Sequence, residues 1–292
     1  MLDSIEKFIM DFLYVAEFAE NKKINTVSSF KKDLAQFNNY LKTKEKIEEI
    51  TKITPIIIRG FLLFLQSNKV TKRSINRKLS SLRGFFKYLI KSNIIKINPV
   101  EKISSFSFDT DDPDILTIDE VNRLRAVIDE SSINGLRDRL ILELLYSTGI
   151  TATEMLLIGE NMFNLNIREL KVYNGKSNRT VFFSNKTKEY YIKYIEEKKK
   201  YYKEKYSANI VFINGSGTRL SDRSLRRLID RYADRAEFTR EISPYSFRHT
   251  FAVYMLTHGM PVNYLKTLMG HITVESTMIY ENLIFKKGLK NE

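Results

Sequence analysis

Apolar residues recur three and four positions apart through the first hundred residues, which is the spacing of amphipathic helices. Thr54 and Pro55 are typical of a helix cap and a first helical residue, and Asn98-Pro99 ends the helical pattern. We therefore predict a four-helix domain over residues 1–100. Its helices are expected at residues 3–19, from about residue 26, at residues 56–66 and at about residues 72–92.

A polar stretch rich in helix breakers follows at residues 101–114 and predicts a linker between two domains. Beyond it, Thr117 and Glu120 have the spacing of a capping box that opens a helix. Residues 136–146 are strongly apolar, and we expect this helix at the centre of a second domain. That domain is predicted to cover residues 115–292.

Part of the second domain has a period of two rather than a helical period. Residues 167–184 alternate apolar and polar positions around Asn174-Gly175, which is a strong hairpin turn. A further short strand is expected at residues 210–213. The chain is therefore predicted to be mainly α, with a small antiparallel sheet confined to an α+β second domain.

Two of the predicted helices carry basic faces. The helix at about 72–92 has cations opposite its apolar side, and the helix that follows Ser221 is dense in arginine. Such a face is most often solvated surface, but it can also contact the phosphates of nucleic acid. The candidate DNA-binding residues are Lys72, Arg73, Arg77, Lys78, Arg83 and Lys87 in the first domain and Arg223, Arg226 and Arg227 in the second.

The composition narrows the possible partners and chemistry. The 292 residues carry a net charge of +13, which favours a polyanionic partner, either nucleic acid or an anionic membrane surface. No run of about 18 apolar residues occurs, so no membrane span is expected. Cysteine is absent and the three histidines lack metal-ligand spacing, so no metal is expected. No glycine-rich phosphate loop occurs, so nothing indicates nucleotide hydrolysis or another cofactor.

The candidate chemistry lies between Ser243 and Tyr280. The sequence S-P-Y-S-F-R-H-T-F-A predicts a helix with Arg248 beside an apolar face, where a cation is costly unless an anion meets it. His271 follows Gly270, and Tyr280 lies nine residues further on. Together these side chains can clamp a phosphate, donate a hydrogen bond and attack phosphorus. Taken singly, each is more simply explained as an ordinary residue of a helical domain.

The order R-H-T-F-A, then G-H, then a tyrosine nine residues after that histidine resembles the tyrosine recombinase (phage integrase) family, and within it the Xer-like members. The resemblance extends over nearly the whole chain, including S-I-N-R-K-L-S-S-L-R-G-F-F-K-Y-L in the fourth helix. It implies a SAM-like helical DNA-binding domain and a catalytic domain that close round a duplex. It also implies a site-specific DNA recombinase that works through a 3′-phosphotyrosine and a Holliday junction.

The resemblance further implies the partners and the location. The expected partner is double-stranded DNA with a specific recombination site. The protein is expected to be a monomer in solution and to form a homotetramer on DNA. No membrane is involved, and the expected location is the cytoplasm, in association with the nucleoid. The basic tail after Tyr280, residues 281–292, is expected to dock on a neighbouring protomer.

The resemblance assigns roles to individual residues. Tyr280 is the expected nucleophile, while Arg248 and His271 would bind the non-bridging oxygens of the scissile phosphate. Lys176 would protonate the departing 5′ oxygen, although a lysine at a turn tip is ordinarily a surface residue. Glu154 is either the acidic partner of the first catalytic motif or an ordinary carboxylate in the first turn of a helix.

Two positions depart from the family's pattern. Thr151 stands where the family places its first active-site arginine, and Tyr245 stands where it usually has a histidine. A phenol can donate a hydrogen bond, but it does not share a proton near neutral pH as an imidazole does. His249 matches a position outside the catalytic set and is expected to be structural. A DNA-binding relative with little catalysis therefore stays open, and a type IB topoisomerase-like activity is a weaker alternative.

Overall fold

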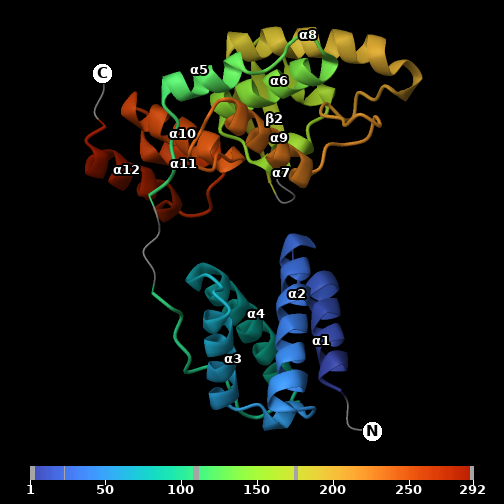
Figure 1. The fold of residues 1–292 in the computed structure, drawn as a ribbon, viewed down its shortest axis with the longest axis vertical. Helices are drawn as coiled ribbons and strands as arrows, with labels where there is room; N and C mark the ends of the chain where they lie inside the picture. Colours follow the sequence, from blue (N-terminus) through green and yellow to red (C-terminus); the bar gives the residue numbers. More distant parts are fainter. Residues whose placement is uncertain (1–3, 23, 108–111, 174–176, 290–292) are drawn as a thin grey trace. The chain divides into compact units, whose positions relative to one another are not determined.

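The computed structural model describes residues 4–22, 24–107, 112–173 and 177–289, which fall into two compact units (Figure 1). The first unit is Met1–Thr110 and the second is Asp111–Glu292. Ile103 is buried in the core of the first unit, whereas Asp114 accepts a hydrogen bond from Arg240 in the second. The segment predicted as a linker is therefore partly built into each unit.

The first unit is helical, and the four helices predicted from the sequence are present. The Thr54 side chain caps α3, which begins at Pro55 as the sequence indicated. Four fully buried phenylalanine rings hold α2, α3 and α4 together, and they pack edge to face or tilted. The elements are α1 (Ile5–Tyr14), the π-helical η1 (Val15–Ala19), α2 (Ile24–Tyr40), the π-helical η2 (Leu41–Glu45), the 3-10 turn η3 (Ile50–Lys52), α3 (Pro55–Ser67) and α4 (Lys72–Lys91).

The second unit combines helices with a small sheet (Figure 1). Its first helix begins with the capping box of Thr117 and Glu120 that the sequence predicted. Within the described ranges of the chain, no helix is both long enough and apolar enough to cross a bilayer. The elements are α5 (Ile118–Ala126), α6 (Ile133–Thr148), α7 (Ala152–Leu156), the 3-10 turn η4 (Glu160–Met162), β1 (Phe163–Asn164), β2 (Glu169–Tyr173), β3 (Asn178–Phe182), α8 (Asn185–Tyr202), the 3-10 turn η5 (Lys203–Lys205), α9 (Asp222–Arg235), α10 (Pro244–Thr257), α11 (Val262–Met269) and α12 (Glu275–Lys287).

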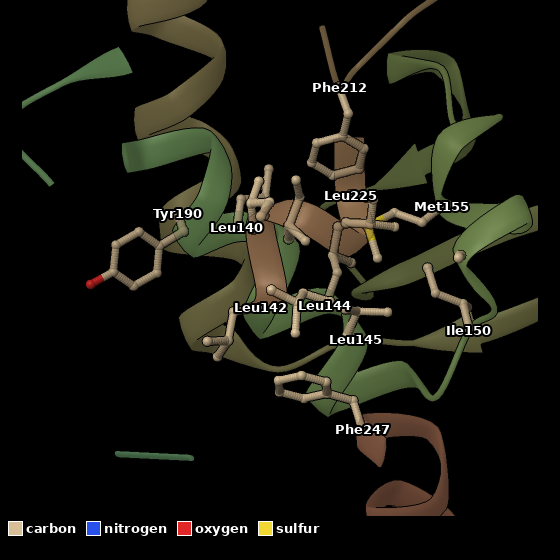
Figure 2. Close-up of a cluster of buried hydrophobic side chains, with 14 of the residues drawn as sticks. Leu140, Leu142, Leu144, Leu145, Ile150, Met155, Tyr190, Phe212, Leu225 and Phe247 are labelled. Carbon is tan, nitrogen blue, oxygen red and sulfur yellow. The ribbon is translucent and has the colours of Figure 1, made fainter. Parts of the chain in front are cut away.

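Helix α6 lies at the centre of this unit, packed against α8 and α10. Figure 2 shows leucines of α6 among side chains from α7, α8, α9 and α10. Even its charged residues are buried and paired. Glu143 accepts two hydrogen bonds from Arg125 at 2.9 and 2.8 Å and one from Arg139 at 3.0 Å. The paired charges allow the helix to be buried on every side, since a buried carboxylate is costly without partners.

The strands form an antiparallel sheet in the order β1-β2-β3. Leu170 pairs with Val181, and both are fully buried, so one face of the sheet covers the core. The two predicted hairpin strands are confirmed, while the turn at Asn174-Gly175 lies outside the described residues.

The short strand expected at residues 210–213 was wrong, because Ile213 makes only an isolated bridge with Arg219. Side chains take the carbonyls of this segment instead: Tyr194 donates to the carbonyl of Val211 at 3.0 Å, and Arg137 to that of Ile213 at 2.8 Å. Backbone acceptors that are satisfied in this way leave few groups for a neighbouring strand.

Helix α12 extends beyond Tyr280 to Lys287, so most of the sequence expected as a tail is helix. Leu283 is 2% exposed and packs with Phe251 and Leu265 in a cluster of its own. The segment after Tyr280 therefore contributes to the core of this unit.

Gly149, which ends α6, offers a test of this packing. Its φ is 60°, and an added Cβ would lie 2.3 Å from the Phe251 ring. We expect Gly149→Ala to lower the free energy of unfolding by about 2–4 kcal/mol, because it adds backbone strain and overpacking. Gly215→Ala is the control, since a Cβ there meets nothing within 4 Å. Equal urea-unfolding midpoints for the two variants would contradict the expectation.

Candidate active site

The junction between α6 and α7 supplies backbone rather than a cation to the site. Thr151 is the N-cap of α7 and forms a capping box with Glu154, with the Thr151 amide donating to Glu154 Oε2 at 2.8 Å. Thr151 therefore serves as the cap of this helix, and Glu154 makes the reciprocal contact of the capping box. The carbonyl of Gly149, two residues before this cap, accepts a hydrogen bond from Arg248.

Arg248 on α10 is buried at 6% exposure and is held by two carbonyls. Its Nη1 donates to Gly149 O at 2.6 Å and its Nη2 donates to Met269 O at 2.6 Å. Among the residues that the structure describes, no carboxylate forms an ion pair with it. Burial lowers the pKa of Arg248, although an arginine stays protonated at neutral pH. The cation thus keeps donors and charge for an anion.

A second guanidinium, which the sequence analysis did not name, lies beside the first. Arg179 on β3 donates from Nε to Leu268 O at 2.6 Å and forms a two-pronged ion pair with Glu154, with Nη2 to Oε2 at 3.0 Å. Gly270 leaves room for it, since a Cβ there would lie 3.0 Å from Arg179 Nη1. Arg179 and Arg248 are therefore held by the consecutive carbonyls of Leu268 and Met269.

The charge of Glu154 is stabilised in this arrangement. Burial raises its pKa, but the hydrogen bonds from Arg179 and from the Thr151 amide outweigh burial and leave the pKa below its usual value. Glu154 is thus ionised at neutral pH. Since two guanidiniums face one carboxylate, the cluster retains a positive charge.

His271 follows the C-cap of α11, and its Nδ1 lies 2.7 Å from the buried hydroxyl of Thr277. Burial lowers its pKa to about 4, with a further contribution from Arg248 and Arg179. The imidazole is therefore neutral at neutral pH. Its ring stacks on that of Tyr280, with the centroids 6.5 Å apart.

Tyr280 on α12 is 2% exposed, and its hydroxyl lies 2.9 Å from His249 Nδ1. Burial raises the pKa of Tyr280, and the charge of Arg248 partly opposes that rise. The contact with His249 was not anticipated from the sequence, which placed this histidine outside the catalytic set. Tyr245 is half exposed, and its ring centroid lies 6.3 Å from that of His249.

The structure thus brings Tyr280, Arg248, His271 and Glu154 into one cluster with Arg179 and His249. Lys176 lies outside the described residues. The signals that could have revealed the two missed residues were weak: Arg179 is an arginine in a polar half of a hairpin strand, and His249 simply follows Arg248. Neither has a spacing that points to the site.

The basic face of α4 is partly committed to internal contacts. Asp33, whose side chain is 1% exposed, forms ion pairs with Arg77 and with Lys78, the latter at 3.0 Å. Arg83 donates to the carbonyl of Ile103 at 2.6 Å. A buried carboxylate and a buried carbonyl both need donors, which the sequence pattern did not reveal. Arg226 pairs with Asp222. The candidate DNA-binding residues that are exposed and have no such partner among the described residues are Lys72, Arg73 and Lys87 on α4 and Arg223 and Arg227 on α9.

Comparison with known proteins identifies the class. Residues 114–287 match the phage integrase family, and residues 13–93 match the phage integrase N-terminal SAM-like domain. The chain belongs to the phage integrase family. The predicted fold class, the predicted resemblance to tyrosine recombinases and the expectation of an enzyme of that class are confirmed.

Individual relatives are similar over most of the chain. Tyrosine recombinase XerC of Thermodesulfovibrio yellowstonii is 35% identical over 285 residues, covering 96% of this chain and 92% of the relative. Tyrosine recombinase XerD of Staphylococcus saprophyticus is 29% identical and covers 96% of this chain and 95% of the relative.

Solved structures share the fold. The post-cleavage complex of the XerH site-specific recombinase with a palindromic difH substrate has a TM-score of 0.76 at 18% identity, over 96% of this chain and 82% of that one. The Tn1549 transposon integrase with a circular intermediate DNA has a TM-score of 0.72 at 18% identity, over 94% of each chain.

The ion pair between Glu154 and Arg179 leads to a stability prediction. Glu154→Gln leaves the partly buried Arg179 cation without its carboxylate. We expect a loss of about 3–5 kcal/mol in the free energy of unfolding at neutral pH, measured by urea unfolding. Glu281→Gln, at an exposed position of α12, is the control and should change little.

The same variant should show a defined dependence on pH. Because the folded-state pKa of Glu154 is depressed, its contribution is fully present above the unfolded-state pKa near 4.5. The contribution is lost as the pH falls through the lower folded-state value. The stability difference between the wild type and Glu154→Gln should therefore shrink below pH 4.5, and a difference that stays constant there would contradict the pairing.

Proposed function

We propose that this protein is a site-specific DNA recombinase that cuts and rejoins DNA through a 3′-phosphotyrosine on Tyr280. The observation that carries the proposal is the convergence of a phenol, a neutral imidazole and two guanidiniums in one cluster with surplus positive charge. Similar structures support it, since XerH was solved after cleavage of its difH substrate and the Tn1549 integrase was solved with a circular intermediate DNA.

In the proposed reaction the Tyr280 oxygen attacks the scissile phosphorus and the 5′ oxygen leaves. A guanidinium has five N–H donors, and the carbonyls of Gly149 and Met269 engage two of those of Arg248. The remaining donors can bind the non-bridging oxygens of a phosphate, together with His271. Because backbone carbonyls hold the arginine in place, little reorganisation is needed when charge develops on those oxygens.

Arg179 bears on the departure at Thr151. The family resemblance places an active-site arginine at that position, and this chain has a helix cap there. Arg179 comes from β3 instead and lies against the same motif through Glu154. Two of its N–H donors are not engaged by Glu154 or Leu268, so it can supply a second guanidinium to the phosphate. This favours an active enzyme.

The remaining parts of the proposal follow from the family. Lys176 protonates the leaving 5′ oxygen, and four protomers on two duplexes exchange strands through a Holliday junction. The phosphotyrosine conserves the energy of the broken bond, so neither a metal nor a nucleotide is consumed. The partner is double-stranded DNA with a recombination site, and exposed cations of α4 and α9 contact its phosphates. The proposed location is the cytoplasm.

A DNA-binding relative with little catalysis is the second candidate, and the cap at Thr151 is the observation that favours it. Loss of one preorganised donor costs roughly 3–4 kcal/mol of transition-state stabilisation, a factor of about 10² to 10³. A topoisomerase-like activity would need no synaptic tetramer. Measuring the mass of the protein–DNA complex therefore distinguishes it from recombination, which requires four protomers.

The nucleophile can be tested directly. Duplexes that the protein selects from a randomised pool are nicked at successive positions, so that cleavage next to the nick traps a covalent complex. We expect the wild type to form covalent complexes and Tyr280→Phe to form none, because its ring has no oxygen to bond to phosphorus. Tyr254→Phe, at an exposed position of α10, is the control and should react normally. Covalent complexes with Tyr280→Phe would refute the assignment.

The role of Arg179 can be tested by removing its guanidinium and introducing one at position 151. Arg179→Lys keeps the charge beside Glu154 but loses the planar fork, and we expect covalent-complex formation about tenfold slower or more. The double variant Arg179→Lys/Thr151→Arg should recover part of that loss, because a guanidinium returns from α7. A wild-type rate for Arg179→Lys would contradict this role. A gain of about 10² or more from Thr151→Arg alone would instead mark Thr151 as a true catalytic defect.

A further inference from the structure

The hydroxyl of Tyr280 has a specific partner in His249. The two residues lie on α12 and α10, and His249 Nδ1 is 2.9 Å from Tyr280 Oη. The ring centroids are 5.6 Å apart with the planes at 50°, so the contact runs through the ring edge and the hydroxyl. The distance is that of a hydrogen bond between the phenol and the imidazole nitrogen, in which the hydroxyl donates when Nδ1 carries no proton.

The other polar groups near Tyr280 are poorly suited to accept its proton. Arg248 carries only donors. His271 has its Nδ1 engaged with Thr277, at 2.7 Å, and stacks on the ring of Tyr280. Tyr245 is half exposed and is itself a phenol. Among the described neighbours of the hydroxyl, His249 is thus the basic group that already contacts the reacting oxygen.

The surroundings of His249 set its protonation state. Burial lowers the pKa of His249, and the adjacent Arg248 lowers it further, so that the imidazole is neutral and can accept a proton. Asp114 opposes both effects and would stabilise the imidazolium once formed. The Oδ1 atom of Asp114 accepts a hydrogen bond from Arg240 at 2.8 Å, while its buried Oδ2 atom has no hydrogen-bond partner among the described residues. The charged and titratable groups facing His249 are thus Arg248, Asp114, His271, Tyr245 and Tyr280.

We infer that His249 is the catalytic residue that accepts the phenol proton when Tyr280 attacks DNA, an inference that rests on the proposed function. In that step the bond between Tyr280 Oη and phosphorus forms as the bond to the 5′ oxygen breaks. The proton of the phenol passes to His249 Nδ1, and the 5′ oxygen takes a proton from Lys176, its proposed donor. Rejoining returns the proton from His249 to the phenol. His249 thereby does the work that a histidine at the position of Tyr245 would otherwise do.

Kinetics test the inference against a purely structural hydrogen bond. His249→Asn keeps a polar atom near the position of Nδ1 but cannot take up a proton. We expect covalent-complex formation on the nicked duplexes to fall by about 10² to 10⁴ at neutral pH, with DNA binding unchanged. We also expect the wild-type rate to rise with pH as His249 loses its proton, and this rise to be absent from His249→Asn. His258→Asn is the control, because this exposed histidine at the end of the same helix is remote from the hydroxyl.

A modified substrate distinguishes the loss of the proposed base, His249, from the loss of the proposed acid, Lys176. With sulfur in place of the 5′ bridging oxygen, the leaving group departs without a proton, so a Lys176→Ala defect should be relieved. The His249→Asn defect should persist, because the phenol must still lose its proton. A His249→Asn rate within about threefold of the wild type, with an unchanged pH profile, would overturn the inference.

Spectroscopy supplies a readout that needs no activity. The chain has three histidines, so histidine labelled with ¹⁵N yields few signals. We expect His249 to be neutral at pH 7 with an unprotonated Nδ1, and that signal to shift in Tyr280→Phe. A protonated Nδ1 would overturn the inference even in an inactive protein. Failure of the wild type to form covalent complexes, with this signal as expected, would instead count against the proposed function.

Discussion

The burial of one guanidinium against backbone carbonyls is the constraint on which the candidate site depends. Arg248 is held by Gly149 O, where α6 ends, and by Met269 O, where α11 ends. The carbonyls at a helix C-terminus lack intrahelical partners and carry partial negative charge, so they can hold a cation without neutralising it. Three helices are therefore fixed to a single point, and the positive charge at that point stays available to an anion.

The rest of the cluster is organised around that charge. Arg179 would repel Arg248 in a buried position, but Glu154 neutralises it and is itself fixed by the cap of α7. The positive charge and burial together keep His271 neutral. Burial keeps the proton on Tyr280, so the nucleophile needs an acceptor. Burial and neighbouring charges thus give residues of one cluster different protonation states, and therefore different roles.

Most of the fold was predictable from the sequence, because helical periodicity and caps are local. The helix start at Pro55, the capping box at Thr117 and the paired strands of the hairpin are all present. The expected strand at residues 210–213 was wrong because distant side chains, including Tyr194, take its carbonyls. Likewise, α4 showed a basic face, but Asp33 from α2 occupies part of it. Such competition for partners is not encoded in spacing.

The sequence by itself determined the class of protein and the principal candidates Arg248, His271 and Tyr280, because their order and spacing are fixed along the chain. Only the tertiary structure decided what surrounds them. Arg179 lies 25 residues from its carboxylate partner, and His249 lies 31 residues from the hydroxyl that it contacts. The physical reason is that a charge or a proton responds to distance in space, and packing of α10 against α6 and α12 sets those distances.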